Sequence, residues 1–75
     1  MFEAIKAKFL DYVDYPEDQF TEQTEIIKDL QMNSFDIVTL LGEIETEYDI
    51  QFVQEDIDTV VTVGDLCNCI KAKLQ

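Results

Sequence analysis

Apolar residues recur at helical spacing in three stretches of the chain, and in each they form one stripe wide enough to face a protein core. In residues 2–14 the stripe consists of Phe2, Ile5, Phe9, Tyr12 and Val13. In residues 34–48 it consists of Ile37, Leu40, Leu41, Ile44 and Tyr48. In residues 63–74 it consists of Val63, Leu66, Cys67, Ile70 and Leu74. The pattern therefore predicts three long helices.

A shorter helix is predicted between the second and third of these stretches. Residues 55 to 60 carry acids in the first turn, where the helix dipole favours them, and an apolar side made by Ile57, Val60 and Val61. Ile50 and Phe52 alternate as in a strand, but no partner strand is predicted, so we reject a strand there. The expected fold is an all-α four-helix bundle of three longer helices and one short helix.

The connection between the first two helices is long and mostly polar. Tyr15-Pro16 ends the first helix, since a residue before proline avoids helical geometry. A loop as long as residues 17–32 is uncommon in a compact domain. We therefore expect its four isolated apolar residues to anchor it across the helices: Phe20, Ile26, Ile27 and Leu30.

Two helix starts have recognisable caps. Asn33 is placed as N-cap with Asp36 three residues later, a variant of the capping box, which puts Ser34 at the first helical position. Thr62-x-x-Asp65 has the form of a capping box for the last helix, with Val61 and Leu66 spaced as a hydrophobic staple. Lys71 and Lys73 suit the negative end of that helix.

Length and composition favour one small domain over residues 1–75. The chain has two glycines and one proline, which argues against a turn-rich β architecture. It contains no apolar run long enough to cross a bilayer, and its first residues lack the basic and apolar regions of a signal peptide. We therefore expect a cytoplasmic monomer.

The charge distribution indicates which kind of partner the bundle binds. There are 17 acids and five basic residues, all lysines, for a net charge of −12, and residues 29–70 contain no lysine. Such a surface repels nucleic acid and anionic membranes, and it steers basic protein partners toward the middle of the chain.

Ser34 is the residue with the most distinctive position. If Asn33 caps the helix, the Ser34 hydroxyl is left free at the positive end of a helix dipole, where an attached phosphate would be favourably placed. The alternative is that Ser34, like many serines at helix starts, has only a structural role.

The chain resembles acyl carrier proteins over nearly all of its 75 residues. The resemblance rests on four segments: Asp29-Leu30, Asn33-Ser34-Phe35, the acidic helix end Glu45–Ile50, and Thr62-Val63-Gly64-Asp65. It implies that Ser34 receives 4'-phosphopantetheine from coenzyme A through a phosphopantetheinyl transferase. The thiol of this arm would then carry acyl groups as thioesters to acyl-transfer, condensing or ligase enzymes with basic patches.

The resemblance also implies a docking face on the second helix, for which we expect Asn33, Phe35, Asp36, Thr39, Gly42, Glu43, Glu45 and Glu47. Asn33 stands where the family usually has aspartate, and Phe35 where it usually has leucine. Phe35 either points outward as the apolar centre of an interface or folds back against Met32 or Ile26. Glycine at position 42, in mid-helix, lowers helix stability by about 1 kcal/mol relative to alanine. Its presence indicates either that a partner approaches the helix closely there or that the residue arose by neutral sequence drift.

Other chemistries lack the residues they need. Without histidine there is no Ser-His-Asp triad, and neither a glycine-rich phosphate loop nor an EF-hand loop is present. The acids Asp36, Glu43, Glu45, Glu47 and Asp49 predict only weak, nonspecific divalent-ion association. Cys67 and Cys69 point in different directions on a helix, so we expect two ordinary thiols.

Two questions stay open at the level of the sequence. For the cargo we expect fatty-acid or polyketide-type biosynthesis, because the Gly-Gly-His-Ser-Leu-like pattern of many peptidyl carriers is absent, and the alternative is an aminoacyl or other specialised pathway. From a different class, the chain is an acidic protein-interaction module in which Ser34 is never modified.

Overall fold

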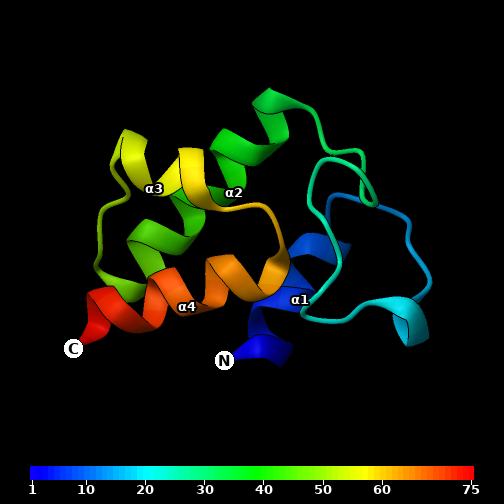
Figure 1. Cartoon of the computed structure of the whole chain (residues 1–75), viewed down its shortest axis with the longest axis horizontal. Helices are drawn as coiled ribbons and strands as arrows, with labels where there is room; N and C mark the ends of the chain where they lie inside the picture. The colour runs from blue at the N-terminus through cyan, green and yellow to red at the C-terminus, as the bar shows by residue number, and fades with distance from the viewer.

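The computed structural model describes all 75 residues as four helices and no strand (Figure 1). The helices are α1 (Phe2–Leu10), α2 (Ser34–Tyr48), α3 (Gln54–Thr59) and α4 (Val63–Leu74), with a single 3-10 turn η1 (Glu17–Gln19) in the long loop. The predicted all-α architecture of three longer helices and one short helix is confirmed.

The core is formed by one cluster of buried apolar side chains to which every helix except α3 contributes. Its members are Ile5, Phe9, Phe20, Ile26, Leu30, Met32, Leu40, Ile44, Val63, Leu66, Cys67 and Ile70. Burying one side chain of this size stabilises a fold by about 1.5–3 kcal/mol. The core therefore fixes α1, α2, α4 and the long loop more firmly than α3.

Three details of the predicted elements are wrong. The first helix ends at Leu10 rather than Asp14, because Tyr12 and Val13 donate to the Phe9 carbonyl at 2.9 and 3.1 Å in a last loose turn before the chain departs toward Pro16. Leu74 is 49% exposed because α4 ends with it at the edge of the molecule. Val61 is 51% exposed, since its backbone, rather than its side chain, joins the long loop.

The long loop is attached to the start of α4 by backbone hydrogen bonds. Ile26 N–H donates to the Val61 carbonyl at 3.0 Å, and Val63 N–H donates to the Thr24 carbonyl at 2.9 Å, around an antiparallel bridge between Glu25 and Thr62. Phe20, Ile26 and Leu30 are buried as expected. Ile27 is not: it is 62% exposed, because the contact that turns Ile26 inward leaves the next side chain on the surface.

Gly64 is required where this loop meets α4. Its N–H donates to the Glu22 carbonyl at 2.8 Å, and a Cβ at this position would lie 2.9 Å from the same oxygen. The predicted capping box next to it is confirmed, since Asp65 N–H donates to Thr62 Oγ1 and Thr62 N–H donates to Asp65 Oδ2, both at 3.0 Å.

Candidate functional site

Ser34 is the first residue of α2, and its side chain is exposed. It is also the only serine in the chain. As predicted, Asn33 is the cap: its Oδ1 accepts from Asp36 N–H at 2.8 Å, and its Nδ2 donates to Asp36 Oδ2 at 3.2 Å. The Ser34 hydroxyl makes no hydrogen bond within the protein, so it is free at the positive end of the longest helix.

The segment before Ser34 is held in place on both sides of one strained residue. Leu30 and Met32 are both buried, whereas Gln31 between them adopts a left-handed conformation with φ of 54°. A left-handed residue other than glycine costs about 1–2 kcal/mol, which the burial of its two neighbours offsets. The start of α2 is therefore fixed by the core, although Ser34 itself is on the surface.

An apolar ridge follows Ser34 on the outer face of α2. Phe35 is 80% exposed and Val38 is 68% exposed, one helical turn apart. The alternative in which Phe35 folds back onto the loop is thus excluded. Val38 was not among the predicted docking residues, although its spacing of three residues from Phe35, outside the core stripe, was a usable signal.

The four predicted docking acids of α2 all have partners within the chain, and these partners differ in charge. Asp36 binds Asn33, Glu43 accepts from the Tyr12 hydroxyl, and Glu45 Oε2 accepts from Phe52 N–H at 2.8 Å. Those three partners are neutral. Glu47, by contrast, forms an ion pair with Lys8 of α1. Glu47 is therefore the one acid of the group that forms an ion pair.

These contacts also change the acid–base properties of Lys8 in α1 and of Tyr12 just after it. The hydrogen bond to Glu43, followed by burial and the charge of the same carboxylate, raises the pKa of Tyr12 to about 12. The hydrogen bond to Glu47 raises the pKa of Lys8. Tyr12 and Lys8 therefore stay protonated and keep their contacts with Glu43 and Glu47 of α2.

The remaining predicted docking residues, Thr39 and Gly42, make no side-chain hydrogen bond with another helix. Thr39 is exposed, and its hydroxyl donates to the Phe35 carbonyl at 3.0 Å, which keeps it close to its own helix. Gly42 has no atom within 4 Å of the place where a Cβ would be. The intramolecular packing therefore gives no reason for glycine at this position.

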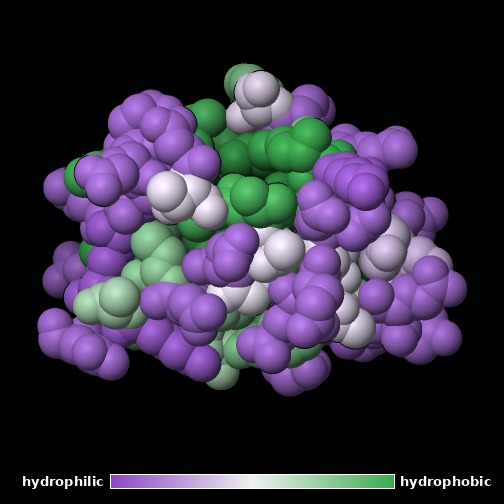
Figure 2. Space-filling view, viewed as in Figure 1, coloured by the Kyte–Doolittle hydropathy of each residue, from purple (hydrophilic) through white to green (hydrophobic).

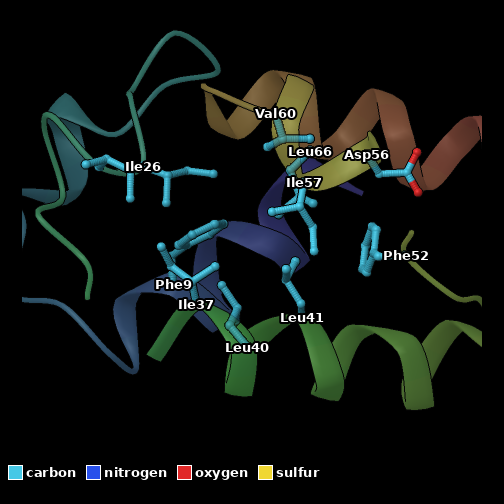
Figure 3. Close-up of a pocket in the computed structure, with 11 residues that line it drawn as sticks. Phe9, Ile26, Ile37, Leu40, Leu41, Phe52, Asp56, Ile57, Val60 and Leu66 are labelled. Atoms are coloured by element: carbon cyan, nitrogen blue, oxygen red, sulfur yellow. The ribbon is translucent and has the colours of Figure 1, made fainter. Parts of the chain in front are cut away.

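An apolar cavity of about 120 Å³, which was not predicted from the sequence, lies between α2 and α3 (Figure 3). Ten of its eleven lining residues are hydrophobic, and Asp56 is the exception. They are Phe9, Ile26, Ile27, Ile37, Leu40, Leu41, Phe52, Asp56, Ile57, Val60 and Leu66. A dry cavity of ~150 Å³ accommodates benzene, so this one is large enough for a small apolar group.

The cavity is close to Ser34 along the same helix and is open on one side. Ile37 lines it one turn after Ser34, and i and i+3 residues share a helix face. Ile27 and Ile57 also line it while remaining 62% and 42% exposed. Figure 2 shows an apolar area on this side of the molecule, beside α3 and the long loop.

Other features of the chain offer no competing site. No group of three or more potential ligands is arranged to hold a metal ion. Cys67 is buried and Cys69 partly buried, both as free thiols, and burial raises the pKa of each. None of the helices combines the length and the apolar character that crossing a membrane requires.

Comparison with known proteins gives a consistent result. The sequence model of the family described as "Phosphopantetheine attachment site" matches residues 3–70. The acyl carrier protein of Thermotoga maritima is 31% identical over 74 residues, covering 99% of this chain and 91% of its own length. That of Clostridium acetobutylicum is 35% identical over 72 residues, covering 96% and 94%. The structure of the acyl carrier protein from Enterococcus faecalis superposes with a TM-score of 0.83 at 25% identity, over 96% of this chain and 91% of that one.

Proposed function

The chain belongs to the acyl carrier protein family, and on this premise we propose that Ser34 is the residue that bears its 4'-phosphopantetheine. As a member of the family the protein carries acyl intermediates on this prosthetic group and is a carrier rather than an enzyme. The observation that carries the assignment is the free hydroxyl of the only serine, at the first position of α2.

The surroundings of Ser34 support attachment of a phosphodiester. The Asn33 side chain, and not Ser34, accepts the hydrogen bond from Asp36 N–H at the start of α2. Modification of the Ser34 hydroxyl therefore breaks no hydrogen bond. A negative charge at a helix N-terminus is stabilised by about 0.3–1 kcal/mol. The exposed side chain leaves room for a transferase to approach.

Acyl carrier proteins interact with biosynthetic enzymes, and we propose the outer face of α2 as the docking surface of this one. Phe35 and Val38 would form its apolar centre, and Asn33, Asp36, Thr39, Glu43 and Glu45 would surround them. Glu47 would contribute least, since Lys8 compensates its charge. Gly42 leaves open space in which a partner can approach the helix backbone. The partners would be the phosphopantetheinyl transferase and acyl-transfer, condensing or ligase enzymes with basic patches.

The cavity supports an apolar cargo, which favours fatty-acid or polyketide-type biosynthesis. Its lining offers a single carboxylate and no other polar side chain. An acyl chain on the Ser34 arm would lose water-exposed apolar area there at about 25 cal/mol per Å². A charged aminoacyl group would instead lose its hydration without a full set of polar partners.

We also propose a cytoplasmic location. The two free thiols of α4 suit a reducing compartment, and coenzyme A and the modifying transferase would have to be present in the same compartment.

Intact-mass measurement tests the assignment of Ser34 directly. Incubation with coenzyme A, Mg²⁺ and a broad-range phosphopantetheinyl transferase should add one phosphopantetheine to the wild type and none to Ser34→Ala. Far-UV circular dichroism of Ser34→Ala would establish that it is folded. An unchanged wild-type mass would overturn the assignment and favour the alternative of an acidic interaction module.

A further inference from the structure

Helix α3 is held to the rest of the molecule less firmly than any other helix. It has six residues and none of them is buried. The side-chain hydrogen bonds of Gln54 and Thr59 stay within the helix. Elements with few buried contacts are the ones that open first in native proteins. Whatever keeps α3 in place must therefore be identified among its few contacts with other elements.

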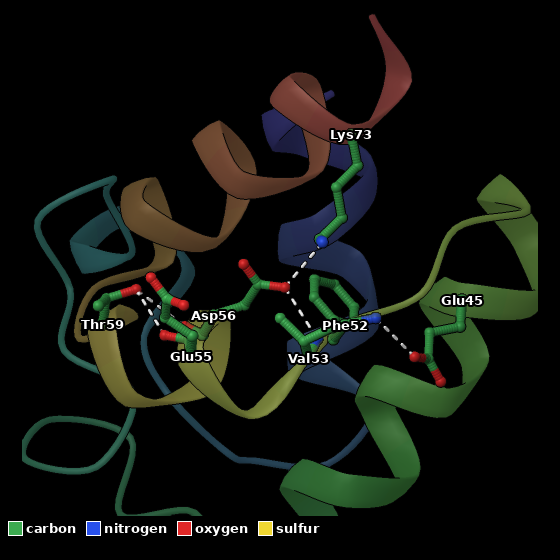
Figure 4. Close-up of polar contacts among 7 residues, drawn as sticks. All are labelled: Glu45, Phe52, Val53, Glu55, Asp56, Thr59 and Lys73. Atoms are coloured by element: carbon green, nitrogen blue, oxygen red, sulfur yellow. Dashed lines mark hydrogen bonds and ion pairs between the residues drawn. The ribbon is translucent and has the colours of Figure 1, made fainter.

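One ion pair connects α3 to another helix. Asp56 Oδ2 lies 2.7 Å from Lys73 Nζ of α4, and the same carboxylate oxygen accepts from Val53 N–H at 2.9 Å (Figure 4). Both side chains of the pair are 23% exposed, so water screens them less than it screens a fully exposed pair. Cys69 of α4 lies beside the same carboxylate.

The segment that leads into α3 also contacts Lys73. Lys73 Nζ is 6.0 Å from the centre of the Phe52 ring, within the range of a cation–π contact. Phe52 N–H in turn donates to Glu45 of α2 at 2.8 Å. Lys73 thus lies where the segment leading into α3 meets both α2 and α4, as Figure 4 shows.

Helix α3 is also one wall of the apolar cavity. Asp56, Ile57 and Val60 line the cavity, and in Figure 3 the side chains of Ile57 and Val60 lie across from those of α2. Asp56 and Val60 also line a shallow surface groove toward α4 that contains Lys73. Movement of α3 away from α2 would therefore open the cavity to its surroundings.

We propose that the Asp56–Lys73 ion pair holds α3 over the apolar cavity and thereby sets how readily an apolar group enters and leaves it. Lys73 is in this sense a positioning residue, since it acts on the cavity through Asp56. The proposal deepens the proposed function, because an acyl cargo would be such a group. It concerns the unmodified protein equally, so it can be tested without any assumption about Ser34.

The chain contains a matched control for this test. Lys71 lies two residues before Lys73 on α4, is exposed and forms no ion pair. Lys71→Met and Lys73→Met change the net charge equally and keep a long apolar side chain. Lys73→Arg retains the positive charge and should behave nearly as the wild type.

Amide hydrogen exchange on the unmodified protein measures the hold on α3. Loss of a partly exposed ion pair should speed exchange of the Val60 amide, which bonds to the Asp56 carbonyl, by roughly two- to fivefold in Lys73→Met. Lys71→Met should leave it unchanged. Amides of α1 give the internal reference, since a general loss of stability would accelerate them as well.

Benzene is a suitable apolar probe for the second measurement. Titration should shift the methyl resonances of Leu41 and Ile57, and line-shape analysis should give faster exchange of benzene in Lys73→Met than in Lys71→Met. Equal α3 exchange in these two variants, or the absence of any saturable shift at the cavity methyl groups, would overturn the proposal.

Discussion

At the scale of single residues, the two glycines of the chain have opposite surroundings. Gly64 lies against the Glu22 carbonyl with no room for a Cβ, whereas Gly42 faces open space in the middle of α2. Glycine loses more conformational freedom than alanine on entering a helix. The same substitution should therefore have opposite effects at these positions.

We expect Gly64→Ala to destabilise the protein by about 1–3 kcal/mol, because the new Cβ forces the Glu22 backbone away and strains its hydrogen bond. Gly42→Ala should stabilise it by about 1 kcal/mol. Urea unfolding followed by circular dichroism measures both. If Gly42→Ala also weakens binding of a partner enzyme, glycine is there for close approach; unchanged binding would indicate drift.

Asp65 should make stability depend on pH in the acidic range. Hydrogen bonds from Thr62 N–H, then Val61 N–H, lower its pKa in the folded protein. The unfolded chain then binds the proton more tightly, so this contribution is complete above a pH of about 4 and is lost as pH falls below it. Asp65→Asn should cost about 1 kcal/mol at neutral pH. Its melting temperature should approach that of the wild type as the pH falls through the lowered pKa of Asp65, and a difference that stays constant with pH would contradict this account.

At the scale of elements, helical periodicity predicted α2 and α4 well because each packs one stripe of side chains against the core along most of its length, with Leu74 at the end of α4 as the exception. It could not place the end of α1, since Tyr12 and Val13 stay on the same side after regular hydrogen bonding has stopped. The cavity was not predictable either. It depends on the separation between α3 and α2, which no pattern within one helix contains. The caps at Asn33 and Thr62 were predictable because capping is local.

The apolar ridge of α2 leads to a prediction about docking. Phe35→Ala should lower kcat/KM of the phosphopantetheinyl transferase by at least about fivefold, and Val38→Ala by less, because central apolar residues dominate small interfaces. Leu74→Ala, which removes an exposed apolar side chain at the end of α4, is the control. Both α2 variants should keep their stability within about 0.5 kcal/mol, since the side chains are exposed. Equal effects of Phe35→Ala and Leu74→Ala would argue against this docking surface.

At the scale of the whole molecule, three of the five lysines form ion pairs within the chain. Lys6, Lys8 and Lys73 form ion pairs with Glu17, Glu47 and Asp56. Two of these pairs involve acids within residues 29–70, and the other acids of that span form no ion pair, so most of the net charge of −12 is uncompensated. A charge this far from zero destabilises the compact state by self-repulsion and attracts basic partners.

Salt should therefore affect stability and partner binding in opposite directions. Between about 50 and 500 mM NaCl we expect the melting temperature to rise, because screening weakens self-repulsion, and KM of the transferase for this protein to rise as steering weakens. The value of kcat should change little. Thermal unfolding and steady-state kinetics over the same salt series provide the measurement. A KM that is independent of salt would contradict a docking surface based on charge.

The backbone bridge between Glu25 and Thr62 has a consequence for biosynthesis. The loop that leads to Ser34 is joined to the start of α4 by backbone hydrogen bonds with Val61 and Val63, which are synthesised after it. Pairing between such distant segments must wait until the later one exists. A nascent chain that ends before residue 61 therefore presents its serine on an unsupported segment, and we predict that the transferase modifies the finished protein rather than the nascent chain.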